Sequence, residues 1–477
     1  MTAQTILPAN SATTATGYNV TNSLRFNESD DCLIKTFGSA GNRKLWTYSV
    51  WFKRGKLGGS YALFVAGASG NDEATMRVEA DKIDWQHYDK GTNSTDAQLL
   101  TSQLIRDPSA WYHLVCAYDS ANSTAGDRMK MFLNGSEITS FSTDNNPSLN
   151  YDSAINNNVL HNIGRQSWNS SADFSGYMAE ICFIDGAALA PTSFGEFDED
   201  SGIWKPIDVS ELTFGGNGFY LPFENSAALG QDDSGETNNW TVNNLTAIDQ
   251  TTDTPTNNFA TLNGVALNNN TGANYITLSE GNLKAVGTSA SNNGNAFSTI
   301  GFSSGKWYCE VKMVDADTSL FPCVGVITES SINNSTGNNG TIGQVTSDTV
   351  GYSPDGEKVI GGTESSYGDT FTNNDIIGIA IDCDNGAVYF SKNGTFQASG
   401  DPTSGASKTN AAMTFTPSKY YFFGGSVYQS TNVIEFNFGN PTFTGTDKTD
   451  GNSRGSFEYA PPSGFLSLCT ANLSESG

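Results

Sequence analysis

The sequence predicts an all-β protein built from consecutive β-sandwiches. Long helical windows with apolar residues at three-to-four spacing are hard to find in the 477 residues. Short β-branched and aromatic runs instead alternate with polar turns at close intervals. The chain is rich in turns, because it holds 50 glycines and only 16% charged residues. At this length two or three domains are expected.

The clearest strand and turn signals lie between Asn374 and Phe396. A β-branched strand from Ile376 to Ile381 ends at the turn sequence DCDNG. The run AVYFSK then alternates as a second strand, and the following Asn-Gly pair is what a two-residue type I′ hairpin turn requires. Because Asp382 and Asp384 stand at a strand end before this turn, we interpret them as turn residues and not as catalytic ones.

The same order of elements occurs earlier in the chain, between Trp111 and Ile138. An apolar strand ends at Asp119, a polar turn and a second strand follow, and Asn134-Gly135 comes next. This Asn-Gly pair precedes the later one by 393 − 134 = 259 residues. The sequence therefore predicts two sandwiches of related design.

The predicted domain organisation has four parts. They are an N-terminal arm (1–20), a first jelly roll (21–200), a polar connector rich in Gly and Asn (201–265), and a second jelly roll with a C-terminal strand (266–477). The arm has little to bury, so we expect it to be extended or disordered without a partner. The connector holds one short apolar strand, GFYLPF, and is expected to lie against the first sandwich.

Charge and cysteine usage restrict the possible partners. A formal charge of −26 repels phosphate backbones, so nucleic acid is not an expected ligand. No apolar run is long enough to insert in a membrane, and the N-terminus does not resemble a secretory signal, which predicts synthesis and folding in the cytoplasm. The seven cysteines are widely spaced and mostly within apolar runs, so we expect buried free thiols and no zinc site.

The first block resembles the laminin-G-like, concanavalin-A-like jelly roll. The resemblance runs from Ser23 to Phe197 and is carried by WTYSVWFKRG, WYHLVCAYD, MKMFLNGSEI and FSGYMAEICFIDGAALAP. The second block resembles a SPRY domain from Leu267 to Gly439. Its matching pieces are GKWYCEVKM, FPCVGVIT, VGYSPDGEKVIGG, the stretch from Asn374 to Phe396, and YYFFGGSVYQSTNVIEFNFG.

Two further segments are similar to structural proteins of marine tailed bacteriophages. One is Gly202 to Asn258, and the other is the C-terminal GFLSLCTANL, which resembles a closing strand of that group. These resemblances imply a virion structural protein.

Enzymatic activity is not expected. Glucanases of the jelly-roll superfamily carry Glu-x-Asp-x-x-Glu, which places two carboxylates on one face of a strand. In the late apolar strand the corresponding segment is AEICFID, where Cys182 follows Glu180 at the position that needs an aspartate. A phosphate-binding loop is also missing.

Binding is the predicted role, through rim loops or the concave sheet of a sandwich. Aromatic side chains in polar surroundings are the candidate ligand contacts, since their rings offer large contact areas to sugars. These residues are Trp85, His87, Tyr88, Trp168 and Tyr367. In SPRY relatives loops grip protein ligands, which would implicate Ser330 to Thr346 and Gly362 to Asn374.

Laminin-G-like domains often hold calcium at one rim, and Asp119 and Asp127 flank a turn of suitable character. A solvated turn is the favoured interpretation, and bound calcium is the alternative. No other cofactor is expected.

The resulting hypothesis is a non-enzymatic virion protein of a tailed phage, a tail-fibre or adsorption component that binds a host surface glycan or protein. Its expected partners are other virion proteins and a second copy of itself, as in a trimer. A head-decoration or capsid-fibre protein is the first alternative, and a glycoside hydrolase is the second.

Overall fold

The computed structural model describes residues 17–67, 72–166, 172–267, 275–289, 292–316, 321–334, 340–344, 346–428 and 431–476. The chain divides into two compact units between Thr256 and Asn257. We call them the first sandwich and the second sandwich. The predicted arm lies outside the described residues except for 17–20.

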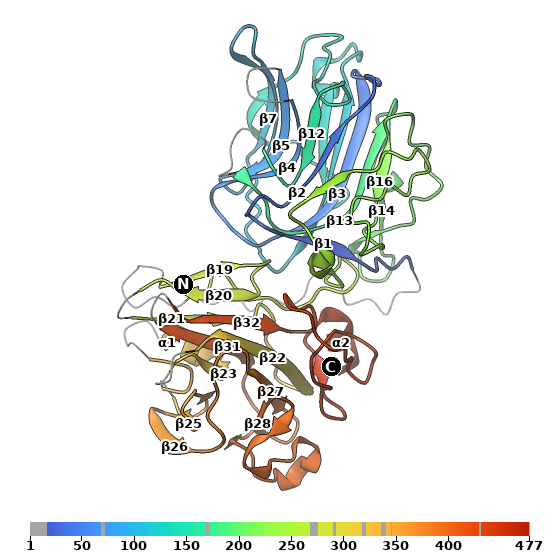
Figure 1. Cartoon of the computed structure of the whole chain (residues 1–477). Coiled ribbons are helices and arrows are strands. Elements are labelled where there is room, and N and C mark those ends of the chain that lie inside the picture. The colour runs from blue at the N-terminus through green and yellow to red at the C-terminus, as the bar shows by residue number, and fades with distance from the viewer. Residues whose placement is uncertain are drawn as a thin grey trace. The chain divides into compact units, whose positions relative to one another are not determined.

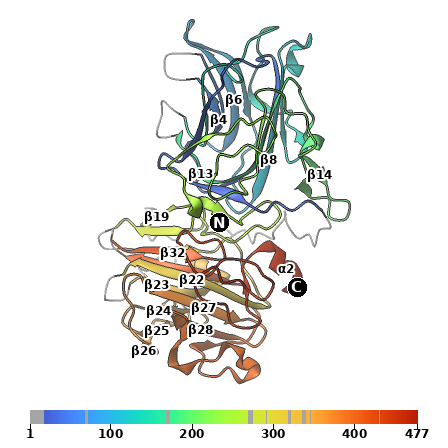
Figure 2. The same ribbon diagram turned by 45° about the vertical axis from the view of Figure 1, so that its right-hand side comes forward.

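Two sheets form the first sandwich, and Figures 1 and 2 show them as separate layers. Sheet A has the order β10 (Ser136–Glu137), β9 (Met129–Leu133), β8 (Trp111–Asp119), β3 (Leu45–Arg54), β13 (Ser175–Asp185), β1 (Ser23–Asn27) and β18 (Gln250–Thr251), with β16 (Phe219–Leu221) also paired to β13. Sheet B has the order β11 (Phe141–Asn145), β7 (Ser94–Thr101), β6 (Lys82–Asp89), β5 (Glu73–Glu79), β4 (Ser60–Ala66), β12 (Leu160–Ile163), β2 (Cys32–Thr36) and β17 (Thr241–Asn243). A separate hairpin joins β14 (Gly195–Phe197) to β15 (Trp204–Pro206).

The second sandwich also has two sheets. Sheet C has the order β19 (Ile276–Ser279), β20 (Lys284–Gly287), β32 (Val433–Asn437), β22 (Lys306–Asp315), β27 (Ile376–Asp382), β28 (Ala387–Lys392) and β29 (Thr395–Phe396), while β30 (Met413–Thr414) pairs with β28 and β33 (Leu466–Ser467) pairs with β22. Sheet D has the order β21 (Asn293–Phe297), β31 (Tyr421–Tyr428), β23 (Cys323–Thr328), β24 (Val350–Tyr352), β25 (Glu357–Ile360) and β26 (Thr363–Ser366).

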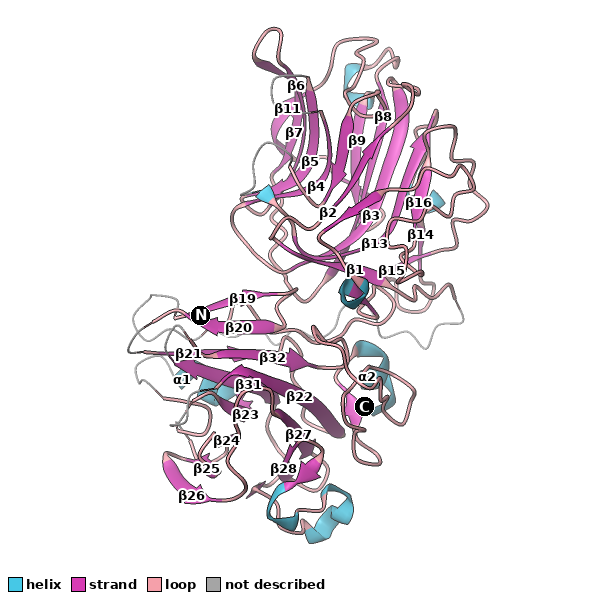
Figure 3. Ribbon diagram, in the orientation of Figure 1, coloured by secondary structure: helices cyan, strands magenta, loops and turns pink. Residues whose placement is uncertain are grey.

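Helix is scarce in the described residues, as Figure 3 shows. The α-helices are α1 (Glu329–Asn334) and α2 (Thr470–Ser476), and the 3₁₀ turns are η1 (Ala125–Asp127), η3 (Pro191–Ser193), η4 (Ala247–Asp249), η5 (Gln397–Ser399) and η6 (Pro402–Ser407). The all-β prediction is therefore confirmed. Among these residues no helix has the length and apolar character needed to span a membrane.

The hairpin predicted at Asn393-Gly394 forms as expected. Lys392 pairs with Thr395, and both central residues have positive φ, 48° at Asn393 and 79° at Gly394, as a type I′ turn requires. Strand β27 is buried on both faces. Ile377, Ile379 and Ile381 face the core of the second sandwich, and Ala380, on the other face, belongs to a separate buried apolar cluster. This double burial explains its uninterrupted apolar run.

The segment predicted as a connector is instead part of the first sandwich as far as Thr256. It supplies β16, β17 and β18, and its Phe219, Leu221 and Trp240 lie in the core with Trp46 and Trp85. Apolar strands this short cannot bury their side chains alone, so they add to existing sheets. The prediction that the segment lies against the first sandwich agrees with this placement, but the boundary at 265 does not.

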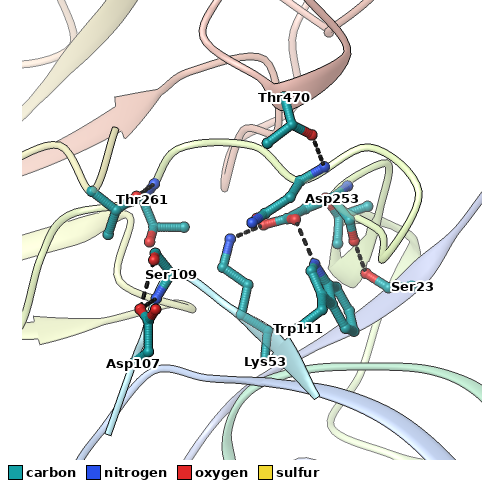
Figure 4. Close-up of polar contacts among 11 residues, drawn as sticks. Ser23, Lys53, Asp107, Ser109, Trp111, Asp253, Thr261 and Thr470 are labelled. Atoms are coloured by element: carbon teal, nitrogen blue, oxygen red, sulfur yellow. Dashed lines mark hydrogen bonds and ion pairs between the residues drawn. The ribbon is translucent and has the colours of Figure 1, made fainter. Parts of the chain in front are cut away.

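A buried ion pair fixes the end of this segment. Lys53 Nζ lies 2.8 Å from Asp253 Oδ2, and Trp111 Nε1 donates to Asp253 Oδ1 at 3.1 Å (Figure 4). Ser23 Oγ donates to the Asp253 carbonyl oxygen at 2.6 Å. Burial lowers the pKa of Lys53, while the attraction of Asp253 opposes that shift. The pair thus links strand β3 of the sheet to the last residues of the unit.

The prediction of a C-terminal strand is mostly wrong. Only Leu466 and Ser467 form a strand, β33, which runs parallel to β22, and the chain then turns into α2. Asp450 accounts for the turn, because its Oδ2 accepts the N–H and the hydroxyl of Ser467 and the side-chain amide of Asn472. These side-chain bonds favour a compact turn over an extended strand.

Candidate functional site

The outer face of sheet B, which points away from the core, carries a cluster of polar side chains. Along β6, Ile83, Trp85 and His87 face the core, so Asp84 and Gln86 face outward. Neighbouring strands continue the pattern with Thr75 and Arg77 on β5, Gln98 on β7 and Asn162 on β12. We call these six residues, Thr75, Arg77, Asp84, Gln86, Gln98 and Asn162, the polar face.

An ion pair reinforced by an amide lies at the centre of the polar face. Arg77 stands directly opposite Asp84 across the strand pair, and its Nε and Nη2 lie 3.0 and 2.9 Å from Asp84 Oδ2. Gln98 Nε2 donates to the other carboxylate oxygen at 2.8 Å. Burial raises the pKa of Asp84, and Arg77 and Gln98 counteract that rise. The carboxylate is therefore fixed in direction by two neighbouring strands.

A second row crosses the sheet beside this pair. Asn162 pairs with Val65, Val65 with Thr75, Thr75 with Gln86, and Gln86 with Gln98. Thr75 and Asn162 are 1% and 2% exposed, and the Thr75 hydroxyl and the Asn162 Nδ2 have no hydrogen-bond partner in the described part of the chain. Buried polar atoms of native proteins normally have partners, so this row has unused hydrogen-bonding capacity.

Two of the predicted ligand contacts are wrong because their side chains face the core. Trp85 and His87 have no exposed surface, and they pack with Trp46 and Tyr118 inside the sandwich. Burial lowers the pKa of His87 to about 3, so the imidazole is neutral. Side chains that alternate along one strand point to opposite faces, so Tyr88 does not share a face with them.

Tyr88 is half-buried and lies on the same side of β6 as Asp84 and Gln86. Its hydroxyl donates to Asn93 Oδ1 at 2.8 Å, and the Lys90 Nζ lies 6.0 Å from its ring centroid. Tyr88 therefore remains a candidate ligand contact at the end of the polar face.

The two remaining aromatic candidates do not join this cluster. Trp168 lies outside the described residues. Tyr367 belongs to the second sandwich, where it is half-buried and packs edge-on against Tyr352 and Phe390. Burial raises the pKa of Tyr367 to about 12. Its ring packs against the apolar core of the second sandwich, directly after strand β26.

The contacts of Asp119 and Asp127 are those of turn residues. Asp119 Oδ1 accepts the N–H of Ala121 at 3.2 Å, and Asp127 Oδ1 lies 3.1 Å from Lys130 Nζ. Across the residues described, no group of three or more His, Cys, Asp or Glu side chains is placed to hold a metal ion. Calcium binding at these two aspartates stays a prediction.

Glu180, the residue nearest to a glucanase motif, contacts tyrosines. It sits at an irregularity in the pairing of β13 with β3, with a φ of 50°. Its Oε2 accepts the hydroxyls of Tyr18 at 3.0 Å and Tyr220 at 2.8 Å. Burial raises the pKa of Glu180 to about 7. These hydrogen bonds hold the side chains of the two tyrosines against sheet A.

Sequence reasoning missed the polar face, although a signal for it was present. The stretch KIDWQHYD alternates apolar and polar residues, so a strict period of two assigns Trp85 and His87 to one face and Asp84 and Gln86 to the other. The pairing of Arg77 with Asp84 depends on the register between strands, which single-strand patterns do not give.

Amide, hydroxyl and paired charged groups on a sheet face suit the recognition of a polar ligand. Residues 27–191 match the laminin-G-type family described as the concanavalin A-like lectin/glucanases superfamily, and residues 306–441 match the SPRY domain family. The chain therefore carries a laminin-G-like, concanavalin-A-like domain followed by a SPRY domain, both jelly rolls.

Several solved structures are similar to parts of the chain. The SPRY domain of human HERC1 is 16% identical, with 37% of this chain and 96% of that chain covered and a TM-score of 0.28. A heptameric SAP-like pentraxin from Limulus polyphemus is 16% identical over 36% of this chain and 80% of its own, also with a TM-score of 0.28. Domain 4 of AbnA, an extracellular arabinanase from Geobacillus stearothermophilus solved with arabinotriose, is 15% identical over 35% and 72%, with a TM-score of 0.26.

A comparison with curated proteins finds no match.

Proposed function

We propose that this protein is a non-enzymatic binding protein whose first sandwich binds a glycan on the polar face of sheet B. The arrangement of Arg77, Asp84 and Gln98 carries the proposal, because the buried Asp84 carboxylate holds the partly exposed Arg77 guanidinium and Gln98 amide in fixed positions, where they can meet a polyhydroxylated ligand. Gln86, next to Gln98 on the neighbouring strand, is half-buried and supplies a further amide. Tyr88 adds an aromatic surface at the edge of this array.

We further propose that the protein is part of a tailed-phage virion, as a tail-fibre or adsorption component. The support is the tandem of two binding-type domains together with the phage-like segments at Gly202 to Asn258 and at the C-terminus. In this role it would contact other virion proteins and a host surface glycan or protein, as a homo-oligomer such as a trimer.

A glycan array with the full-length protein tests the binding proposal. The variant Gln86→Ala/Gln98→Ala should lose binding, because two amides of the array are removed. Gln103→Ala is the matched control, since Gln103 is exposed and follows β7 outside the polar face. If wild type binds no glycan, or if the double variant binds as wild type does, the polar face is not the site.

Mass spectrometry of purified virions tests the second proposal, and absence of the protein from particles would refute it. Immunogold labelling separates tail from head attachment. Labelling of heads without adsorption of the isolated protein to host cells would favour a head-decoration role.

A further inference from the structure

A cavity of about 170 Å³ lies in the first sandwich between matching edges of its two sheets. Its wall comes from β7 and β11 at the edge of sheet B and from β9, β10 and η1 at the edge of sheet A. Asp144 stands opposite Leu99 in the β11 and β7 pair, so both side chains point to the same side of sheet B. The cavity is thus separate from the polar face, which is on the other side of that sheet.

Part of the floor of the cavity is apolar. Leu99, Met129 and Ile138 belong to the buried core, and Phe141 is half-buried against that core. These side chains offer a small apolar contact, which suits one face of a small ring whose other groups are polar. The volume is below the roughly 300–1,000 Å³ of pockets that hold drug-sized ligands.

The rim of the cavity offers mainly acceptors. Lys130 is already paired, since its Nζ lies 3.1 Å from Asp127 Oδ1 and 3.4 Å from Glu137 Oε1. Asn146 Nδ2 donates to Asp144 Oδ1 at 2.9 Å, while Asn146 Oδ1 is buried and makes no hydrogen bond within the described residues. The lining residues hold two carboxylates, Glu137 and Asp144, against one ammonium group, so an anionic ligand would be repelled.

We infer that this cavity binds one neutral sugar residue, with the C–H face of the ring on the apolar floor and its hydroxyls donating to Asn146 Oδ1 and Asp144. A short amine would satisfy the acceptors but leave the floor without a partner, so the apolar side chains favour the sugar. This inference rests on the proposed function, because the ligand is again a glycan. The cavity would be a second glycan site, separate from the polar face.

Gly126 allows a sharp test. It lines the cavity, has an ordinary φ, and a Cβ placed on it would meet no atom within 4 Å. Gly126→Trp should therefore place a large side chain at the cavity lining, where it competes with a ligand, without straining the backbone. Gly38→Trp is the matched control, because Gly38 has the same freedom and lies outside the lining. Asn146→Ala is a second variant that removes the unpaired acceptor and leaves the backbone untouched.

Ligand-observed NMR with the full-length protein measures binding of methyl glucoside, methyl galactoside and N-acetylglucosamine, with glucuronic acid and n-butylamine as charged probes. A neutral sugar should bind wild type and Gly38→Trp with millimolar affinity, since the site is small, and roughly tenfold or more weakly after Gly126→Trp or Asn146→Ala. The inference is overturned if no neutral sugar binds wild type, if Gly126→Trp binds as wild type does, or if a charged probe binds better.

The polar-face variant Gln86→Ala/Gln98→Ala separates the two sites. Retained monosaccharide binding in that variant, together with loss of its array signal, supports both proposals. If wild type gives no array signal but its monosaccharide binding is lost in Gly126→Trp, the polar face fails and the cavity stands. If the array signal depends on the polar face and no monosaccharide binds wild type, the cavity fails and the polar face stands.

Discussion

The Oδ1 atom of Asn393 accepts the backbone N–H of Ile376 at 2.9 Å, and the N–H of Asn393 donates to the Ile376 carbonyl at 2.8 Å. Asn134 makes the same two bonds to His113, at 2.8 and 2.9 Å. In both sandwiches the asparagine of a type I′ turn thus also bonds the strand that precedes its hairpin. The internal repeat in the sequence therefore corresponds to a shared structural device.

Replacing Asn393 by alanine should lower the free energy of unfolding of the second sandwich by about 1–3 kcal/mol. The variant loses a hydrogen bond to a backbone group and puts alanine, which tolerates left-handed backbone less well than asparagine, at a position with positive φ. Asn393→Gly should lose less, because glycine accepts the positive φ. Differential scanning calorimetry measures both, and equal stability of Asn393→Ala and wild type would contradict this role of the turn.

Removing Arg77 should destabilise the first sandwich strongly. The Asp84 side chain is 0% exposed, so Arg77→Met leaves a buried carboxylate without its cation, at a cost of about 3–5 kcal/mol. Lys44→Met is the control, since Lys44 and Asp152 form an ion pair with both side chains at least 40% exposed. Urea denaturation should detect little change in that control, and a similar small change in Arg77→Met would show that the pair is dispensable.

A fragment of residues 15–256 should fold, whereas a fragment of residues 21–200 should not. The shorter fragment lacks Phe219, Leu221 and Trp240, each fully or almost fully buried in the core. Burial of each such side chain stabilises the folded state by about 1.5–3 kcal/mol. The three contributions together are a large part of the free energy of unfolding of a typical domain. Circular dichroism and calorimetry check both fragments, and a cooperative transition in 21–200 would refute the boundary at 256.

The first sandwich should become less stable as pH rises from about 4.5 to about 7. Burial raises the pKa of Glu180 from 4.5 to about 7, so the folded state binds a proton that the unfolded state has released in this range. The stabilisation is complete below pH 4.5 and lost as pH rises through about 7, by on the order of 3 kcal/mol.

Glu180→Gln should flatten this dependence, because glutamine does not titrate, and Glu137→Gln, at an exposed position, should not. Denaturation of the three proteins at pH 5 and pH 8 measures the effect. An unchanged pH dependence in Glu180→Gln would assign it to other groups.

The seven cysteines should be unreactive in the folded protein. All are buried and unpaired, which confirms the prediction of buried free thiols, and burial raises the pKa of each, for example of Cys469 to about 11. Titration with a thiol-reactive dye should detect almost no thiol before denaturation and all seven after it. Rapid labelling of a folded sample would contradict this burial.

Local sequence patterns were sufficient for the strands, the turns and the tandem arrangement. Asn134-Gly135 and Asn393-Gly394 determine hairpin geometry through backbone conformations that few other residue pairs accept. The β-branched run of β27 and the aromatic run of β3 likewise specify buried strands, because these side chains pack well on a pleated surface. These preferences act over a few residues, so a single sequence reveals them.

The tertiary structure alone decided which groups meet. Arg77, Asp84 and Gln98 come together because three strands pair in one register, and the cavity beside Asn146 is lined by residues from the edges of two sheets. The assignment of Phe219 and Trp240 to the first core, and of Trp85 and His87 to its interior, likewise follows from packing between distant segments. Such contacts depend on long-range pairing and burial, which the pattern within one strand does not specify.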